Sequence, residues 1–458
     1  MPQFTSEMFN NDVLTRNGKL GADACQVMAA ALNAVDAYQC VQSHLSLSGD
    51  RLTVNDERLN LGAFDRVFLV GVGKASVPMT MAVLDRMGSR ITRAVALTKD
   101  AKFLAQDGYL GKLVVLQGAH PVPDERSVAA TQKLLELIPA LTERDLVLMA
   151  ISGGGSALFT DPIADISLND LQTVTTLLLK SGADIQQINT IRKHLDQVKG
   201  GRLAALWAPA QIQTLILSDV IGDDLDMIAS GPTVADPTTF SNAWQIVQAY
   251  GLEKALPESV ARVLQRGLAG EIPESVKPDQ MAKLAVSNHL VGTNRLAAEA
   301  AAAQAKNLGY EAKVLTTTLT GLTAGVSAKL MTEIEKEIKG RERPLCVILG
   351  GETTVNVTGG GKGGRNQDLV LRMVPMLTGK EGVVFISLAT DGEDGPTDAA
   401  GGAADAKVLR EGEVRWGMTV EVYIADNDAY AYLEKTGALI KTGATGTNVN
   451  DLIFIFID

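Results

Sequence analysis

The stretch Val67–Ser76, "VFLVGVGKAS", decides the fold class, because it reads as a buried strand, a glycine turn and the start of a helix. Lys74 stands inside that turn. A Walker A loop would need glycine and Ser or Thr where the chain has Phe68 and Ala75, and a dinucleotide fingerprint would need a third glycine in place of Ser76. The turn therefore puts one cation at the end of a strand without belonging to either standard nucleotide loop.

The same alternation of short apolar runs and longer amphipathic segments continues along the chain. The clearest runs are "VFLVGVG" (67–73), "KLVVLQGAH" (112–120), "DLVLMAISGGG" (145–155), "TLILSDV" (214–220), "LCVILGG" (345–351) and "VVFISLATDG" (383–392). Nearly continuous hydrophobicity over such short lengths is typical of strands that are covered on both faces. We therefore predict parallel sheets inside layered α/β domains.

The 458 residues exceed what one hydrophobic core usually supports, so more than one domain is expected. The stretch "LAGEIPESVKPDQMAK" (268–283) concentrates Pro, Glu and Lys between a helical and a strand pattern. It is the best linker candidate in the chain. We predict a boundary near residue 280, with a larger domain over 1–280 and a smaller one over 281–458.

Composition excludes several classes of protein. Apolar residues make up 46% and charged residues 21%, as in soluble globular proteins, and the net charge of -11 argues against nonspecific nucleic-acid binding. Neither a signal peptide nor a membrane-spanning run is recognisable, which predicts a cytoplasmic protein with no membrane partner. The three cysteines are widely spaced and lack a CxxC, so they are expected to be reduced thiols.

Ligands of open α/β sheets bind at the carboxyl ends of strands. This rule selects the residues that directly follow apolar runs: Lys74, His120, Ser152, Gly153, Gly154, Gly155, Ser156, Asp219, Glu352 and Asp391. The loop "SGGGS" is the one most typical of a phosphate site, because glycines let backbone N–H groups approach an anion. The alternative is a tight turn that needs positive φ angles.

Two further stretches carry clustered cations. "VNVTGGGKGGRNQDLVL" (355–371) places Lys362 and Arg365 among glycines before a helix, where cations and N–H groups can converge on an anion; the alternative is a flexible loop with solvated charges. "NTIRKHLDQVKGGRLA" (189–204) includes Arg192. It is either a helix that presents cations to an anion or an exposed helix with solvated charges.

Two acidic loops complete the set. "SDVIGDDLDMIASGPT" (218–233) carries Asp219 and Asp223 among other acids, and carboxylates this close favour Mg²⁺ bound to phosphate oxygens. In "ATDGEDGPTDAAGG" (389–402), Asp391 is best placed to meet a hydroxyl or a metal. Glycine loops, a few placed cations and acids suit phosphoryl transfer, which needs mainly positioning and charge neutralisation.

These motifs in this order also resemble the glycerate 2-kinases of the MOFRL-domain type, a family sometimes described as hydroxypyruvate reductase. The resemblance runs through "GVGKAS", "GAHPVPDERS", "ISGGGSALF", "INTIRKHLDQVKGGRLA", "SDVIGDDLDMIASGPT", "LGGETTVNV", "GKGGRNQDLVL", "ATDGEDGPTDAAGG" and "TGTNVNDLIFIF". It implies ATP- and Mg²⁺-dependent phosphorylation of D-glycerate at the 2-hydroxyl. It also implies a cleft between a larger Rossmann-like domain and a smaller α/β domain.

The resemblance places the family's essential lysine on Lys74 and its essential arginine on Arg365. Asp219 and Asp391 are candidates for the acid that takes the hydroxyl proton, and Asp219 or Asp223 for magnesium. Substrate- or nucleotide-binding roles are expected for Ser152, Gly153, Gly154, Gly155, Ser156, Arg192, Glu352 and Asn366. The alternative activity is NAD(P)H-dependent hydroxypyruvate reduction. The preferred hydroxy acid, the preferred nucleotide and association into a homo-oligomer stay open.

Overall fold

A computed structural model describes residues 3–339 and 344–458 of the chain. It divides into two compact units. The central unit comprises residues 37–291, and the terminal unit combines residues 1–36 with residues 292–458. Each unit has its own sheet, which confirms the prediction of layered α/β architecture with two sheet-containing domains.

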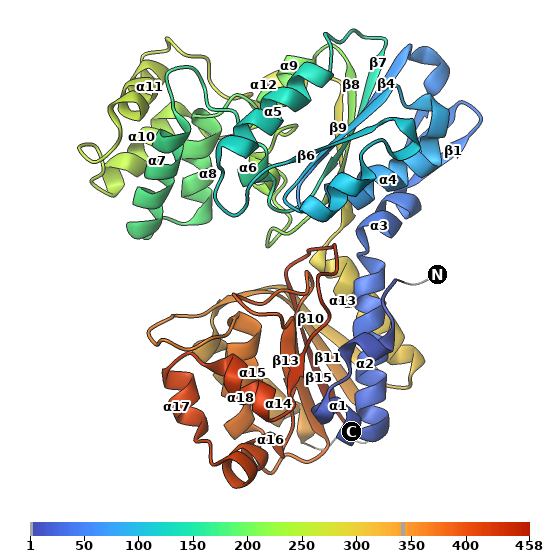
Figure 1. Ribbon diagram of the computed structural model, residues 1–458, viewed down its shortest axis with the longest axis vertical. Coiled ribbons are helices and arrows are strands. Elements are labelled where there is room, and N and C mark those ends of the chain that lie inside the picture. Colours follow the sequence, from blue (N-terminus) through green and yellow to red (C-terminus); the bar gives the residue numbers. More distant parts are fainter. Residues whose placement is uncertain (1–2, 340–343) are drawn as a thin grey trace. The chain divides into compact units, whose positions relative to one another are not determined.

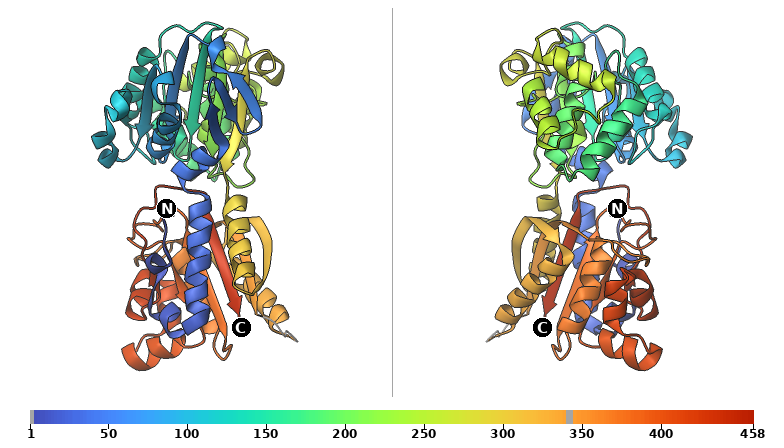
Figure 2. Two further views of the ribbon diagram at one scale, coloured as in Figure 1. Left: turned by 90° about the vertical axis from the view of Figure 1, so that its right-hand side faces the viewer. Right: turned by 90° about the vertical axis from the view of Figure 1, so that its left-hand side faces the viewer.

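The observed division differs from the predicted single boundary near residue 280. Helix α2 (Gly18–Ala34) packs beside α13 (Asn294–Asn307), so the amino-terminal segment belongs with the carboxyl-terminal part of the chain (Figure 2). The Asn11 side-chain amide adds hydrogen bonds to the carbonyl oxygens of Ala438 and Leu439, at 3.1 and 3.3 Å. The amphipathic pattern of α2 reports that one face is buried, but not which distant segment covers it.

The central unit is built on a six-stranded sheet in the order β6-β5-β4-β7-β8-β9. The strands are β4 (Arg66–Val72), β5 (Arg93–Thr98), β6 (Leu113–Gln117), β7 (Asp145–Ile151), β8 (Gln211–Leu217) and β9 (Val286–Gly292). All pairings among β4 to β8 are parallel, as predicted. The strand order reverses between β4 and β7, and this reversal is the topological switch point at which open α/β sheets bind ligands.

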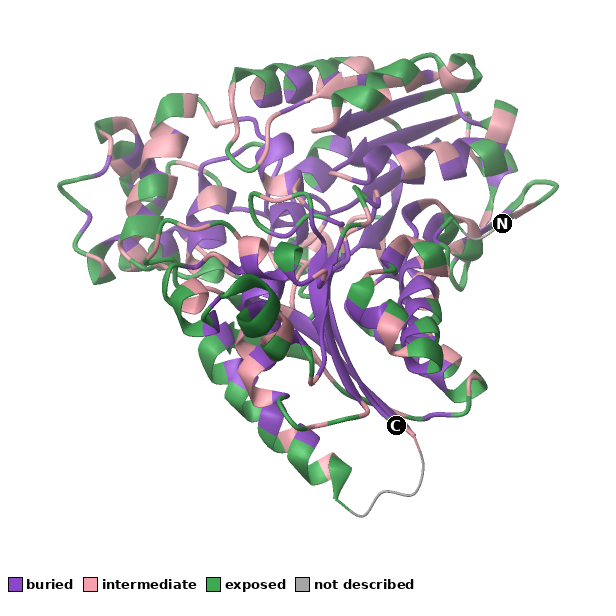
Figure 3. Ribbon diagram, turned by 60° about the horizontal axis from the view of Figure 1, so that its bottom comes forward, coloured by how far each residue is buried: buried purple, intermediate pink, exposed green. Residues whose placement is uncertain are grey.

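Helices cover both faces of this sheet (Figure 1). Helices α3 (Ala37–His44) and α4 (Ser76–Met87) lie over one face, and α5 (Glu125–Leu137) and α9 (Arg202–Trp207) over the other. Strands β4, β5, β7 and β8 are buried along almost their whole length (Figure 3), and every residue of β7 is buried. Two-sided cover is therefore the reason for the continuous apolar runs in the sequence.

A separate helical layer extends the central unit. Helices α7 (Leu168–Lys180), α8 (Ile185–His194), α10 (Phe240–Ala249) and α11 (Glu258–Leu268) enclose an apolar core of their own. Aspartate and serine caps with capping boxes fix the starts of α7 and α8. Helix α8 carries Arg192, for which a binding role is expected from the sequence. A small antiparallel sheet, β1 (Leu45–Ser48), β2 (Arg51–Val54) and β3 (Glu57–Asn60), completes the unit.

The terminal unit has a mixed sheet in the order β10-β11-β15-β12-β13-β14. The strands are β10 (Glu311–Leu322), β11 (Leu345–Thr354), β12 (Val383–Ala389), β13 (Gly401–Ala404), β14 (Leu439–Ile440) and β15 (Asp451–Ile457). Among the strands that the structure describes in this unit, only β10 and β11 pair in parallel, so the prediction of a parallel sheet is wrong here. Apolar runs report cover on both faces and do not specify strand direction.

Helices also cover both faces of the terminal sheet. Helices α2 and α13 lie over one face, and α14 (Thr323–Ile338) and α15 (Arg365–Met376) lie over the other (Figures 1 and 2). The fully buried strand β15 runs between β11 and β12. The first residue of β15, Asp451, therefore carries a carboxylate into the interior at the end of the sheet where β11 and β12 finish.

Cys25, Cys40 and Cys346 are buried thiols, as the sequence predicted. Across residues 3–339 and 344–458, the helices include none with the length and apolar character that a membrane crossing requires.

Candidate functional site

Two backbone contacts join the ends of β4 and β7 at the switch point of the central sheet. The Lys74 N–H donates to the carbonyl oxygen of Gly153 at 2.8 Å, and the Ala75 N–H donates to Ser152 Oγ at 2.9 Å. Lys74 and the glycine loop that follows β7 are thus fixed against each other. Ser152 is buried, so its hydroxyl holds the turn and does not face a ligand.

The residues of the turn explain its departures from the standard nucleotide loops. Gly73 has φ of 122°, and a Cβ there would lie 2.3 Å from the carbonyl oxygen of Ser152, so only glycine fits. Ser76, at the place of the third fingerprint glycine, is buried and donates from Oγ to the carbonyl oxygen of Leu97 at 2.9 Å. Its side chain stands where the third glycine of a dinucleotide fingerprint would let the helix pack closely on the strand.

The side chains of Lys74 and His120 lie against the glycine loop. A Cβ on Gly154 would lie 3.1 Å from Lys74 Cγ and 2.9 Å from His120 Cδ2, so both side chains lie against this residue. Burial, followed by the charges of Lys74 and Lys99, lowers the pKa of His120 to about 4. His120 is therefore a neutral imidazole at physiological pH, in a positive field that suits an anion.

Sequence reasoning missed Lys99, and it selected His120 as a residue at a strand end without giving it a catalytic role. Both follow strands of the same sheet, since Lys99 comes directly after β5 and His120 lies shortly after β6. The rule that ligands gather at strand ends would have found Lys99 if the run "AVALT" (94–98) had been counted with the other strands.

Asp219, which follows β8, approaches the same loop. A Cβ on Gly153 would lie 2.0 Å from Asp219 Oδ2, so the carboxylate lies directly against the loop backbone. Asp223 stands in the next turn with φ of 60°, and its N–H donates to the carbonyl oxygen of Val220. Within residues 3–339 and 344–458, no three His, Cys, Asp or Glu side chains are grouped to hold a metal ion. The two aspartates therefore fit Mg²⁺ only if phosphate oxygens complete its coordination.

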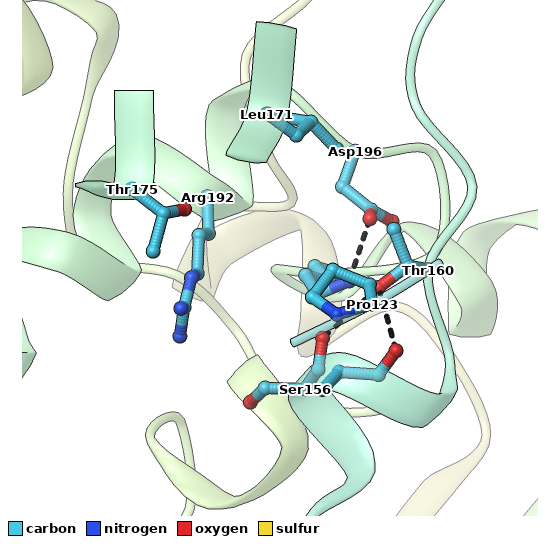
Figure 4. Close-up of a pocket in the computed structure, with 9 residues that line it drawn as sticks. Pro123, Ser156, Thr160, Leu171, Thr175, Arg192 and Asp196 are labelled. Atoms are coloured by element: carbon cyan, nitrogen blue, oxygen red, sulfur yellow. Dashed lines mark hydrogen bonds and ion pairs between the residues drawn. The ribbon is translucent and has the colours of Figure 1, made fainter. Parts of the chain in front are cut away.

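The basic segment at residues 189–204 divides its cations between two tasks. Lys193 and Lys199 are buried, the first paired with Asp226 at 2.6 Å and the second with Asp196 at 2.5 Å. Arg192 instead lines a pocket together with Ser156 (Figure 4). Both lysines are held by aspartates, although Lys199 also lines this pocket. Arg192 differs because it is only half-buried and has no ion-pair partner among the described residues.

In the terminal unit, Arg365 is held by two carboxylates. Its Nε and Nη2 donate to Asp451 at 2.6 and 2.9 Å, and its Nη1 pairs with Glu352 at 3.0 Å. Burial opposes the guanidinium charge, but the hydrogen bonds and charge of Asp451 outweigh burial, so the pKa of Arg365 is raised. The guanidinium is therefore fixed in orientation and remains charged.

The glycine loop before Arg365 does not form the predicted anion site. The Gly360 N–H donates to Asp426 Oδ1 at 2.9 Å, and the Lys362 N–H donates to Asp428 Oδ1 at 3.0 Å. The Lys362 ammonium lies over the ring of Tyr430, 4.6 Å from its centroid. The loop amides are thus taken by the chain's own carboxylates, and that prediction is wrong.

The start of α15 is likewise occupied by a carboxylate. Asp394 accepts from the N–H groups of Asn366 and Gln367 at 3.1 and 2.9 Å. The buried Asn366 side chain donates to Asp394 and accepts from Ser387 Oγ at 2.6 Å. These contacts assign Asn366 to positioning. Asp391, after β12, accepts from the Glu393 N–H at 3.1 Å in an adjoining turn.

Comparison with known proteins is consistent along the whole chain. Residues 23–265 match the family described as a domain of unknown function (DUF4147), and residues 345–451 match the MOFRL family. The D-glycerate 2-kinase of Thermotoga maritima is 43% identical over 86% of this chain and 91% of its own length. The chain belongs to the MOFRL-type glycerate 2-kinase family.

Other members agree in sequence and in structure. The glycerate 2-kinase of Pyrococcus horikoshii is 40% identical over 94% of this chain and 96% of its own, and the human glycerate kinase is 36% identical over 96% and 93%. The crystal structure of the Thermotoga maritima glycerate kinase superposes with a TM-score of 0.81 at 39% identity, covering 95% of this chain and 99% of that chain.

Within this family fold, the central unit brings Lys74, Gly153, Gly154 and Asp219 together at the switch point. Ser156 and Gly155 continue the same loop, and a Cβ on Gly155 would lie 2.5 Å from Ala229 Cβ, so this glycine is required for close packing. The predicted residues of the terminal unit, Arg365, Glu352 and Asn366, gather around Asp451 and Asp394.

The contacts of Gly154 generate a matched test. Gly154→Ala should lower kcat/KM at least about tenfold, because the added methyl meets Lys74 and His120. Gly182 has the same left-handed φ, 81° against 82°, but nothing lies within 4 Å of its Cβ position. Both alanines should cost about 1 kcal/mol of stability. Steady-state kinetics in which Gly182→Ala loses as much activity as Gly154→Ala would contradict this assignment.

Asp394 generates a test by pH. Burial, against the hydrogen bonds from Gln367 and Asn366, raises its pKa from 3.8 to about 6. The folded chain then binds more protons than the unfolded chain between these values. The stability that this group contributes is present below about pH 4 and is lost as pH rises through about 6. Two pKa units correspond to roughly 3 kcal/mol.

Asp394→Asn should therefore cost more stability at pH 4.5 than at pH 7.5. Thermal unfolding of the wild type and the variant at both pH values measures the difference. An equal cost at both would show that Asp394 titrates normally in the folded protein.

Proposed function

We propose that this chain catalyses the ATP-dependent phosphorylation of D-glycerate at its 2-hydroxyl, giving 2-phosphoglycerate and ADP. One observation carries the proposal. Lys74 is anchored at the topological switch point against the Gly153–Gly154 loop, in a chain that shares 43% identity with a D-glycerate 2-kinase. The site thus combines the fold position at which α/β proteins bind ligands with cations suited to a phosphoryl group.

The role of Lys74 is to neutralise negative charge on the transferred phosphoryl group. The transferred phosphoryl group is surrounded by oxygens that carry negative charge, and Lys74 neutralises part of it without further movement of the backbone. Lys99 adds a second positive charge near His120, and His120 itself is uncharged near neutral pH. These cations work against a chain with a net charge of -11, so local placement matters more than total charge.

Asp219 has two roles open to it. It would hold Mg²⁺ together with nucleotide phosphate oxygens, and Mg²⁺ when bound neutralises and orients those phosphates. Otherwise Asp219 or Asp391 accepts the proton of the substrate hydroxyl. A strong base is unnecessary where the transition state is loose, because the hydroxyl proton leaves late.

Arg365 retains donors for a ligand. A guanidinium has five N–H groups, and described residues take three of them, two at Asp451 and one at Glu352. We propose that the remaining two N–H groups bind a phosphate oxygen. The two carboxylates then set the direction of those donors.

Hydroxypyruvate reduction has no support in the site. It requires a dinucleotide loop, and the buried Ser76 and the side chain of Lys74 occupy the turn where that loop would form. Absorbance at 340 nm on mixing the protein, NADH and hydroxypyruvate tests this alternative.

The proposed activity is tested with D-glycerate, ATP and Mg²⁺, coupled to enolase, which accepts 2-phosphoglycerate only. We expect product that depends on all three components, and Lys74→Ala should lower kcat by about 10²- to 10³-fold. Lys180→Ala, an exposed lysine on α7, is the matched control and should keep full activity. Absence of 2-phosphoglycerate from the wild type would overturn the proposal.

Arg365 requires a variant that separates activity from stability. Arg365→Ala leaves the buried Asp451 without its cation and should cost about 3 kcal/mol of stability. Arg365→Lys keeps the charge but loses the fork that meets both carboxylates, so the fold should survive while kcat falls at least about tenfold. Normal kcat in a folded Arg365→Lys variant would remove the oriented guanidinium from the mechanism.

A further inference from the structure

The pocket lined by Arg192 and Ser156 is small, and its polar groups stand among apolar side chains such as Pro123 and Leu171 (Figure 4). It lies within the central unit, where α7, α8 and the end of the glycine loop meet. Its cavity volume is about 20 Å³, and a water needs roughly 10–15 Å³ by the same measure. The space suits a carboxylate group and is far too small for a purine. We call it the Arg192 pocket.

The buried ions at the floor of this pocket are already satisfied. Lys199 donates to Asp196 Oδ2 at 2.5 Å, to the carbonyl oxygen of Phe159 at 2.8 Å and to Thr160 Oγ1 at 3.2 Å. Asp196 also accepts from the N–H of Val198 at 3.0 Å. Neither residue therefore has to bind a ligand to balance its charge.

Arg192 and Thr175 are different. Among residues 3–339 and 344–458, neither side chain has a hydrogen-bond or ion-pair partner, although both line the pocket. Figure 4 shows the Arg192 side chain running from α8 toward the loop that carries Ser156, with Thr175 on the same side. The charge of Asp196 acts on Arg192 through space, without an ion pair. A half-buried guanidinium that makes no ion pair favours an anion with two oxygens, which matches its fork of N–H donors.

Ser156 supplies an acceptor to the same pocket. Ser230 Oγ donates its hydrogen to Asn189 Oδ1 at 3.1 Å, and a hydroxyl has only one hydrogen. In the 2.8 Å contact between Ser156 Oγ and Ser230 Oγ, Ser156 is then the donor. Its lone pairs remain for a hydroxyl group of a ligand.

We propose that the Arg192 pocket is the carboxylate subsite of the substrate, with Arg192 binding the carboxylate and Ser156 accepting from a substrate hydroxyl. This inference rests on the proposed function. Gly154 of the same loop lies against Lys74, so the loop links the carboxylate end of the substrate to the phosphoryl end. In a 2-hydroxy acid the reacting hydroxyl is one carbon from the carboxylate, and anchoring the carboxylate therefore selects that hydroxyl. The substrate class is small 2-hydroxycarboxylates.

Charge selectivity tests the subsite. D-Glyceramide has the shape of D-glycerate without the negative charge. Arg192→Met should lower kcat/KM for D-glycerate roughly 10- to 150-fold, the range for a charge-assisted pair, and leave kcat/KM for D-glyceramide and KM for ATP near the wild-type values. If Arg192 had only a structural role, its replacement would lower kcat/KM for D-glycerate and for D-glyceramide by the same factor. Arg262 is an exposed residue on the outer face of α11, so Arg262→Met is the control and should change kcat/KM for neither substrate.

Two further measurements keep the outcome decisive. Titration calorimetry of D-glycerate without nucleotide should show the same loss of affinity in Arg192→Met. Arg192→Lys keeps the charge, so its affinity for D-glycerate should lie between those of the wild type and Arg192→Met. Suppose that a folded Arg192 variant keeps the wild-type ratio of kcat/KM for D-glycerate to kcat/KM for D-glyceramide. That result would overturn the subsite and leave the kinase function standing. A wild type that neither binds nor phosphorylates D-glycerate would overturn the function and the subsite together.

Discussion

The hydrogen bond from the Lys74 N–H to the Gly153 carbonyl oxygen, at 2.8 Å, is the contact on which the site depends. It crosses the switch point of the central sheet, where β4 and β7 lie side by side and their connections leave in opposite directions. The bond therefore fixes one cation and one glycine loop at the position where open α/β sheets bind ligands. Asp219 and His120, in the same unit, lie against this glycine loop.

Electrostatics explains why so many charges of this acidic chain are already paired. Lys193 and Lys199 are buried against aspartates, and Arg365 is held by Asp451 and Glu352. Such pairs fix loops more than they stabilise the fold, since desolvation offsets much of their attraction. What remains for ligands is a small set of cations, each held by a neighbour or by its backbone. An acidic enzyme can bind anionic substrates in this way without a broadly basic surface.

Sequence patterns predicted the strand ends well, because a strand that is buried on both faces needs apolar residues at consecutive positions. Lys74, Asp219 and the glycine loop all follow from that rule. It did not predict that residues 1–36 pack with the terminal unit or that β15 is antiparallel to its neighbours, since both depend on contacts between distant segments. The glycine loop at 359–364 misled for a related reason. Its amides are taken by Asp426 and Asp428, which lie more than sixty residues further along the chain.

The most direct test of the central claim is a crystal structure of the protein with ADP, Mg²⁺, aluminium fluoride and D-glycerate. In that structure the aluminium fluoride complex takes the place of the transferred phosphoryl group. The account predicts this group within hydrogen-bonding distance of Lys74 Nζ, beside Gly154, with the glycerate carboxylate at Arg192. A fluoride group bound away from the switch point of β4 and β7 would contradict it.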